Sequence, residues 1–322
     1  MQNNYTLFYS DKKKEDIFLI KSMFNNSRKL GLIWIQKDFK DSLDIVQSEL
    51  ENGVSQIIFF GLEIGWDKLI REIRNKYNNI QIKVICNTAD SLLYYDYERD
   101  NFFNLLELSK ENIINNIGFL KKGQYEVYKN LGYKCSYLLE NFISENHMGA
   151  EHDNNNLINI GIYPLNYTWD KNIFNQLSIG KFIDNSVINY NAIDSRMQDF
   201  ADTFKINSNP QNINEDNMFE LISKNNINIA CSFTEYFHTI FFISMELGTP
   251  CITGNTIDIL PDNLKEYLIV NSEDSPKEIS DKIIKCLENK EKILSLYKEW
   301  KQIYNEESKK SIAEFLEEIN IE

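Results

Sequence analysis

Residues 228–255 read NIACSFTEYFHTIFFISMELGTPCITGN, and this stretch holds the pattern that decides the fold. A short β-branched run at 227–232 leads into a polar loop, an apolar helix at 236–247 and a second short run, PCITGN, at 250–255. Two apolar strands joined through one helix are typical of a parallel β–α–β unit. We therefore expect a parallel sheet here, with the polar loop at the carboxyl end of its first strand.

The same alternation of short apolar runs and longer amphipathic stretches extends along the chain. Further strands are predicted at 5–10, 29–36, 56–61, 81–87, 117–120, 135–141, 157–164 and 186–191. Helices are predicted at 15–25, 41–51, 66–77, from near Asp90, after Gly123 and from about Lys171. Near-continuous apolar strands alternating with helices favour parallel sheets covered on both faces. The sequence therefore predicts an α/β protein.

Length and texture divide the chain into two domains. Its 322 residues, 43% of them apolar, are enough for two cores of about 150 residues each. The stretch 144–156, SENHMGAEHDNNN, has no apolar periodicity and is typical of a linker. We expect one α/β domain at 1–143 and a second at 157–322, which ends in a helical segment from Pro276.

Composition excludes several classes of function. The net charge of −14 provides no broad basic surface for nucleic acid, so we expect no nucleic-acid partner. The five cysteines have no metal-like spacing and are interpreted as reduced thiols of a cytoplasmic protein. The first residues reverse the order of a signal peptide, and no uncharged apolar stretch reaches the roughly 18 residues of a membrane span.

The polar loop of 228–255 is the richest candidate for a binding site, because ligands of open parallel sheets bind beyond the carboxyl ends of strands. Backbone N–H groups of Phe237, His238 and Thr239 would lie at the start of the helix, where they favour an anion such as a diphosphate. Glu235 precedes them and could accept hydrogen bonds from ligand hydroxyls. A helix cap or dipole partner is the alternative interpretation of Glu235.

Four further residues could complete a cleft between the domains. Lys171 near a helix start opposes the helix dipole, which an anionic ligand would balance, although a solvated surface lysine is the alternative. Asn87, Thr88 and Asp90 directly follow the strand at 81–87 and would face the cleft from the first domain. Asp90 could cap the following helix, or it could orient or deprotonate an acceptor hydroxyl.

One cluster has metal-ligand residue types, but its polar linker context favours solvated side chains, so we predict no metal site. It comprises Glu145, His147, Glu151, His152 and Asp153. A set of basic residues in the first domain could dock on an anionic membrane surface, although a solvated helix face is the simpler interpretation. The set comprises Lys68, Arg71, Arg74, Lys76, Lys121, Lys122, Lys129 and Lys134.

The run S-F-T-E-Y-F, its apolar helix and L-G-T-P-C-I-T-G-N resemble the donor-binding segment of retaining GT-B glycosyltransferases of the group 1, or family 4, type. Residues 169–176 are similar to the loop and helix after the first strand of that family's second domain. The stretch 117–133 also resembles these enzymes, near the end of their acceptor domain. The resemblance implies two facing Rossmann-like domains, a first that holds the acceptor and a second that holds a nucleotide-sugar donor.

The resemblance also implies an activity: transfer of a hexosyl group, with retention, from a nucleotide sugar to a hydroxyl acceptor in surface-glycan or protein glycosylation. A UDP-sugar is the expected substrate and no cofactor is expected; the acceptor could be a glycan, a lipid-linked sugar or a protein. We expect a cytoplasmic enzyme that could contact the inner membrane face. The catalytic candidates are Glu235, Lys171 and Asp90, with Asn87 and Thr88 on the acceptor side. The donor-binding candidates are Asn172, Thr234, Phe237, His238, Thr239, Gly254 and Asn255.

One departure from the family is Ile243, because family members carry a second glutamate eight residues after the one matched by Glu235. That carboxylate addresses the ribose diol, and its loss removes a hydrogen bond worth roughly 1.5–3 kcal/mol. Glu246 lies three residues further on, and we expect it to have a buried or bridging partner instead. Two other functions therefore stay open: a noncatalytic GT-B-like partner or binding subunit, and a nucleotide-sugar epimerase.

Overall fold

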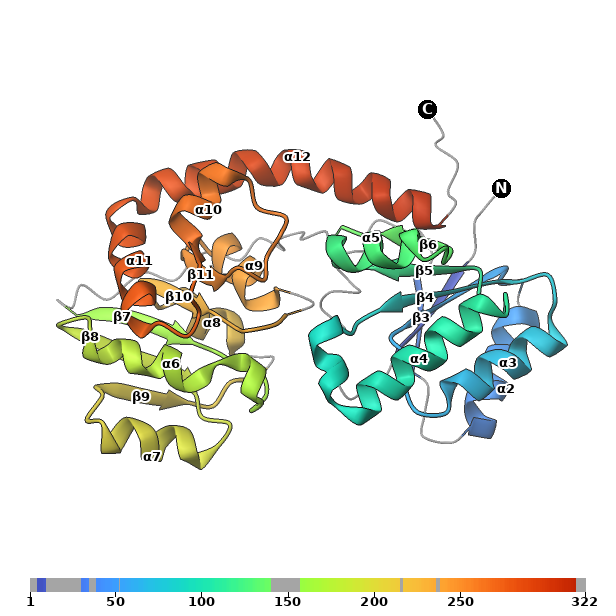
Figure 1. The fold of residues 1–322 in the computed structure, drawn as a ribbon, viewed down its shortest axis with the longest axis horizontal. Coiled ribbons are helices and arrows are strands. Elements are labelled where there is room, and N and C mark those ends of the chain that lie inside the picture. Colours follow the sequence, from blue (N-terminus) through green and yellow to red (C-terminus); the bar gives the residue numbers. More distant parts are fainter. Residues whose placement is uncertain are drawn as a thin grey trace. The chain divides into compact units, whose positions relative to one another are not determined.

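The computed structural model describes residues 5–9, 30–34, 39–51, 53–139, 157–214, 217–235 and 238–316. These residues form two units, each built on its own parallel sheet (Figure 1). The first unit contains the described residues up to 139 together with 304–316, and the second contains those between 157 and 303.

The first sheet has the strand order β2-β1-β3-β4-β5-β6, with every neighbouring pair parallel. Its strands are β1 (Tyr5–Tyr9), β2 (Leu30–Trp34), β3 (Gln56–Phe60), β4 (Gln81–Cys86), β5 (Asn116–Phe119) and β6 (Cys135–Tyr137). The helices described in this unit are α2 (Phe39–Glu51), α3 (Trp66–Lys76), η1 (Asp90–Tyr94), α4 (Asp96–Lys110) and α5 (Lys122–Asn130). The parallel α/β arrangement predicted from the sequence is confirmed.

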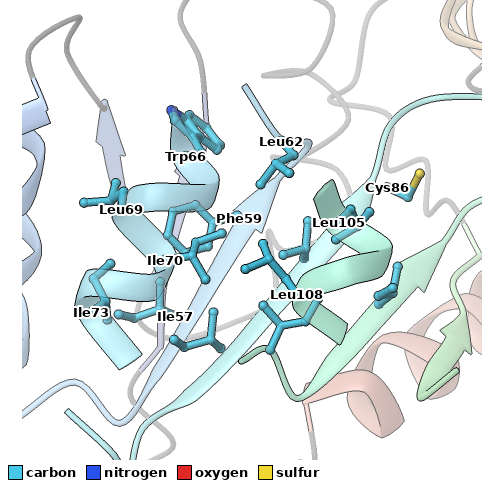
Figure 2. Packing of buried hydrophobic residues seen from close by; sticks show 14 of the residues in the cluster. Ile57, Phe59, Leu62, Trp66, Leu69, Ile70, Ile73, Cys86, Leu105 and Leu108 are labelled. Atoms are coloured by element: carbon cyan, nitrogen blue, oxygen red, sulfur yellow. The ribbon is translucent and has the colours of Figure 1, made fainter. Parts of the chain in front are cut away.

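The core of the first unit lies between strands β3 and β4 and the apolar sides of the helices that cover them. Every residue of β3 is buried, as expected for a strand covered on both faces. Figure 2 shows Trp66, Leu69 and Ile70 of α3 packed against Phe59, and the ring centroids of Phe59 and Trp66 are 5.5 Å apart. Full burial of each such side chain contributes about 1.5–3 kcal/mol, so this cluster fixes α3 on the sheet.

The second sheet has the order β12-β11-β10-β7-β8-β9, again with parallel neighbours only. Its strands are β7 (Ile158–Ile162), β8 (Ser186–Asn191), β9 (Ser208–Gln211), β10 (Ile227–Ala230), β11 (Cys251–Gly254) and β12 (Ile269–Val270). The short helices are η2 (Trp169–Lys171), α6 (Ile173–Ser178), η3 (Ile179–Lys181), α7 (Ser195–Thr203), α8 (Met218–Ser223), α9 (Thr239–Glu246) and α10 (Asp262–Leu268). Two longer helices follow, α11 (Pro276–Glu288) and α12 (Lys290–Leu316).

The start of α11 follows from its local sequence, Ser-Pro-Lys-Glu. The Ser275 hydroxyl accepts a hydrogen bond from the backbone N–H of Glu278 at 3.3 Å, and Pro276 occupies the first turn. A serine cap satisfies an N–H that has no acceptor within the helix, and proline loses nothing there because its own N–H would be unbonded.

The structure differs from the sequence predictions at two edge strands and one helix. Strands β9 and β12 were not predicted, because SNPQ is polar and contains a proline and because Ile269–Val270 directly follows a helix. The long helix predicted from Asp90 is interrupted: η1 ends at Tyr94, and Tyr95 has the extended backbone ψ of 126° before α4 begins. The predicted helix at 15–25 and linker at 144–156 lie outside the described residues.

The end of α12 corrects the predicted domain division, which assigned everything from 157 to 322 to the second domain. Residues 304–316 instead pack within the first unit. The ammonium of Lys83, fully buried in β4, donates to the carbonyl of Phe315 at 2.5 Å, and Ser308 donates to the carbonyl of Leu139. The polar run NEESKKS at 305–311 interrupts the apolar positions where the packing partner changes, but no proline or glycine breaks the helix there, so it continues as one element.

Candidate functional site

Lys171 and Glu235 lie side by side at one edge of the second sheet. Their loops follow β7 and β10, which are neighbouring parallel strands, so both loops leave the sheet at its carboxyl edge (Figure 1). The Lys171 ammonium donates to Glu235 Oε2 at 2.7 Å, and the two side chains are 13% and 19% exposed. Two candidates that are 64 positions apart in the sequence therefore form one partly buried ion pair.

Hydrogen bonds fasten the two loops to each other. The backbone N–H of Phe233 donates to the carbonyl of Asp170 at 2.8 Å, and the Asn172 amide donates to the carbonyl of Cys231 at 3.0 Å. Gln176 Oε1 accepts from the backbone N–H of Cys231 at 3.2 Å. Because the loops are bonded through their backbones, the ion pair is held on a fixed frame.

Asn172 connects this frame to a third loop. Its φ of 53° lies in the left-handed region, which asparagine tolerates better than most residues. Its side-chain nitrogen also donates to the carbonyl of Glu273 at 2.6 Å, while its oxygen accepts from Asn175 at 2.7 Å. Asn172, a predicted donor-binding residue, therefore has its side-chain amide occupied by contacts that shape the site.

Gly254 and Asn255, two further donor-binding candidates, lie where β11 ends. The Asn255 N–H donates to Glu273 Oε1 at 2.7 Å. A Cβ added to Gly254 would stand 2.5 Å from Cγ of Glu273, so a larger residue there would require the Glu273 side chain to shift. Glu273 was not predicted as a site residue, because it lies beyond a two-residue strand that the sequence does not reveal.

A second carboxylate, Asp170, completes the charge arrangement around Lys171. Asp170 is 3% exposed, and its Oδ2 lies 3.8 Å from the Lys171 ammonium. Its other oxygen, Oδ1, has no hydrogen-bond partner in the described structure. One ammonium thus lies between two carboxylates, which gives the group a formal charge of −1. Asp170 directly precedes Lys171 and lies in the stretch 169–176, but it was not predicted as a site residue.

The helix behind the site, α9, begins later than predicted. Its first residue is Thr239, and His238 occupies the N-cap position without a side-chain cap, whereas the sequence predicted a start at 236. Phe237 lies outside the described residues. His238 and Thr239 are both buried, as is Thr234. The start was misplaced because α9 is apolar on all sides and has no polar face to mark its first turn.

Ile243 is fully buried in α9, and Glu246 at the end of the same helix has partners elsewhere. The Glu246 carboxylate accepts from the Tyr297 hydroxyl at 2.8 Å and pairs with the Lys301 ammonium. The expectation of a buried or bridging partner for Glu246 is confirmed, so this carboxylate anchors α12 to α9.

The acceptor-side candidates form a hydrogen-bonded group in the first unit. Asp90 Oδ1 accepts from the Gln124 amide at 2.9 Å and from the Tyr128 hydroxyl at 3.4 Å. Gln124 also donates to the carbonyl of Thr88, whose hydroxyl donates to the buried Glu98 at 2.6 Å. Asp90 is the first residue of η1, and Ala89 takes the N-cap position, so the predicted capping role was wrong.

Asn87 lies against Gly61, at the ends of β4 and β3. The φ of Gly61 is +75°, and a Cβ there would meet the Asn87 amide within 2.6–2.8 Å.

Two members of the basic set have partners in the same unit. Arg71 pairs with Glu107 and Glu111, and Arg74 donates to the carbonyl of Ile113. These contacts give both arginines a role in packing α3.

The chemistry of the site is that of charge and hydrogen bonding. Burial raises the pKa of the Cys231 thiol, and the carboxylates of Glu273 and Glu278 raise it further, so the thiol stays protonated. Among the described residues, no group of three or more His, Cys, Asp or Glu side chains could hold a metal ion. The stretch with His147 and His152, for which the sequence predicted no metal site, lies outside the described residues.

No helix in the described ranges combines the length and the apolar character required to cross a membrane.

No family model and no curated protein matches the sequence. Solved structures match its fold. HepE from Anabaena, in complex with UDP-glucose, has a TM-score of 0.71 at 10% identity and covers 98% of this chain and 100% of its own.

Two further structures match over similar lengths. Sucrose-phosphate synthase from Thermosynechococcus elongatus has a TM-score of 0.65 at 10% identity, covering 98% of this chain and 96% of its own. WaaG, a glycosyltransferase involved in lipopolysaccharide biosynthesis, has a TM-score of 0.66 at 9% identity, covering 99% of this chain and 100% of its own. At such low identity the likeness concerns the fold alone: this chain has the GT-B fold.

Proposed function

We propose that this chain is a glycosyltransferase that moves a sugar from a nucleotide-sugar donor to a hydroxyl acceptor. The observation that carries the proposal is the Lys171–Glu235 pair, at 2.7 Å, at the carboxyl edge of the second sheet. This is the edge at which open parallel sheets bind ligands. The GT-B fold supports the proposal by analogy. The support is no stronger than an analogy because one fold can serve several functions.

The chemistry would be electrostatic. A transferring sugar leaves behind a diphosphate, whose developing charge requires a cation held in place beforehand. Lys171 supplies that cation, and the backbone N–H of Thr239 lies in the first turn of α9, where the helix dipole favours anions. Glu235 would accept hydrogen bonds from the donor sugar. A partly buried setting strengthens each of these interactions compared with bulk water.

We propose UDP as the nucleotide and no cofactor. The support is that Anabaena HepE was solved with UDP and with UDP-glucose on the same fold. In the first unit, Asp90 would orient the acceptor hydroxyl, since Gln124 and Tyr128 fix one of its oxygens. Retention of configuration and transfer to a glycan, a lipid-linked sugar or a protein belong to the same proposal.

The test is a panel of UDP- and GDP-sugars, with sugar transfer or donor hydrolysis as the readout. Glu235→Gln and Lys171→Met should each lower kcat/KM by roughly 10²–10³-fold, because each removes a charge aligned with the reacting groups. Lys224→Met and Glu220→Gln are the matched controls: this exposed ion pair lies in the same unit, and its loss should leave the rate unchanged. Equal rates in the site variants and the controls would contradict the proposal.

The fully buried Ile243 favours a second candidate, a noncatalytic binding or partner subunit. Calorimetric titration with UDP, GDP and their sugars separates the two functions. Saturable binding below millimolar concentration together with sugar transfer supports the enzyme, binding without transfer supports a binding subunit, and the absence of binding supports a partner subunit. A nucleotide-sugar epimerase would instead convert the donor to a new sugar without any acceptor, which analysis of the sugar after incubation of donor alone would detect.

A further inference from the structure

Asp170 is a buried carboxylate whose hydrogen-bonding capacity is only half used. It is 3% exposed, and within the described structure its Oδ1 has no hydrogen-bond donor. Its Oδ2 is 3.8 Å from the Lys171 ammonium, which is close enough for charge attraction and too long for a hydrogen bond. Buried polar atoms without partners are rare in native proteins, and each calls for an explanation.

Neighbouring hydrogen bonds hold the backbone of the turn that carries Asp170. Its backbone carbonyl accepts from the N–H of Phe233, and the carbonyl of the next residue, Lys171, accepts from the Gln176 amide at 2.7 Å. The turn that carries Asp170 is therefore bonded on both sides. The Lys171 side chain, by contrast, is flexible and has three N–H donors. The Lys171 ammonium is therefore a cation near enough to donate a hydrogen bond to the Asp170 carboxylate after a small movement.

We propose that Asp170 is a positioning residue: it is the second counter-ion, to which the Lys171 ammonium moves when a ligand takes the carboxylate of Glu235. The inference rests on the proposed function for the identity of that ligand. In the resting site Lys171 is bonded to Glu235, so neither group can serve a ligand fully. Asp170 keeps the ammonium paired after the exchange and leaves Glu235 to accept hydroxyl hydrogens.

If Lys171 can exchange between Glu235 and Asp170, the thermal stability of the protein without a ligand should depend on both carboxylates together. If either carboxylate can pair with Lys171, then each can replace the other when one is neutralised. Glu235→Gln and Asp170→Asn alone should change thermal stability little, because an anion remains beside the ammonium. The double variant leaves a lysine side chain that is only 13% exposed without either anion. Uncompensated buried charge is strongly destabilising.

The test is a double-mutant cycle on the full chain, measured by calorimetric unfolding. The Tm loss of the double variant should exceed the sum of the two single losses by about 2–4 °C. In a Lys171→Met background the excess should vanish, because no ammonium is left to pair. Additive losses, or an excess that persists in Lys171→Met, would overturn the proposal. Asn and Gln keep the original side-chain shapes, which protects the fold in every variant.

A titration of the same variants with UDP and UDP-glucose examines the role in binding. Asp170→Asn should keep UDP affinity within about twofold or tighten it, since a negative charge is removed near an anion site. In Asp170→Asn, the ratio of UDP-glucose affinity to UDP affinity should fall to the ratio measured for Glu235→Gln. The double variant should show no further fall in this ratio. An unchanged ratio would overturn the inference. If the wild-type protein binds neither nucleotide, the proposed donor is wrong, and the stability cycle still decides whether Asp170 is the second counter-ion.

Discussion

At the scale of single residues, Asn172 shows how backbone conformation and side-chain chemistry meet in one position. Its backbone lies in the left-handed region, and its amide holds the loops that follow β10 and β12. Glycine would suit the backbone but would lose the amide, and most other residues would fit neither. Asparagine satisfies both demands, which explains why a polar side chain only 4% exposed is stable there.

A pair of substitutions separates the two demands. Asn172→Gly should lower the free energy of unfolding by about 1–3 kcal/mol, because the carbonyls of Cys231 and Glu273 lose their donor. Asn172→Ala should cost about 1–2 kcal/mol more, because alanine is strained at a φ of 53°. Urea denaturation followed by circular dichroism measures both. Equal losses in the two variants would show that the backbone contributes nothing.

At the scale of elements, a buried polar network ties α8, β10 and α9 together. The Asn228 amide donates to the carbonyl of Ile222 and to the Ser244 hydroxyl, and its oxygen accepts from Asn225. Asn225 also donates to the Tyr163 hydroxyl of the chain that continues from β7. Asn225, Asn228 and Ser244 are fully buried, so the network persists only because its hydrogen bonds are made.

Strand β7 must leave room for this network, and Gly161 provides that room. A Cβ at position 161 would lie 2.0 Å from Asn228 Oδ1 and 2.4 Å from Asn225 Nδ2. Gly161→Ala should therefore lower the free energy of unfolding by about 1–3 kcal/mol or more.

Gly123, in α5, is the matched control for Gly161→Ala, because a Cβ there meets nothing within 4 Å. Gly123→Ala should be neutral or should stabilise the protein by up to about 1 kcal/mol. Urea midpoints of the two variants give the comparison. A Gly161→Ala protein that unfolds at the wild-type midpoint would show that the network can move aside.

At the scale of the whole molecule, one continuous helix serves both units. The Glu246 carboxylate binds Tyr297 and Lys301 of α12 within the second unit. Further along the same helix, the carbonyl of Phe315 accepts from the buried ammonium of Lys83 within the first unit. A cation at the last carbonyls of a helix also interacts favourably with the helix dipole. Each unit therefore depends on residues that lie far away in the sequence.

The stability of the whole chain should fall as the pH rises above about 9. Burial raises the pKa of the Cys86 and Cys286 thiols from 9.0 to about 12, and that of the Tyr163 hydroxyl from 10.0 to about 12. Below pH 9 both the folded and the unfolded chain keep these protons, so the full stability is present. Above pH 9 the unfolded chain releases protons that the folded chain retains, and stability is lost toward pH 12. Each thiol contributes up to about 1.4 kcal/mol per pH unit.

Urea midpoints at pH 8.5 and 10.5 measure this loss. The double variant Cys86→Ala with Cys286→Ala will start from a lower midpoint, because both thiols fill core space, but its midpoint should fall less between the two pH values. If the double variant falls as steeply as the wild-type protein, the thiols of Cys86 and Cys286 are not the cause of the alkaline loss.

Local sequence patterns were sufficient for most of the fold. Apolar runs such as QIIFF at Gln56–Phe60 predict strands because a strand covered on both faces needs apolar side chains throughout. The same reasoning placed Glu235 in the loop after one strand and Lys171 near a helix start after another, and the parallel pairing of β7 with β10 brings the two to one edge. It failed for β9 and β12, whose residues acquire strand structure only by adding to an existing edge.

The sequence by itself determined the two parallel sheets, the loops that follow their strands and the residue types available in those loops, because periodicity and turn chemistry act over a few neighbouring residues. Only the tertiary structure decided that Lys171 bonds Glu235 while Asp170 keeps an unused oxygen beside it. It also decided that α12 ends in the first unit. These features depend on distances between residues that are remote in the chain, and such distances are set by the packing of whole elements.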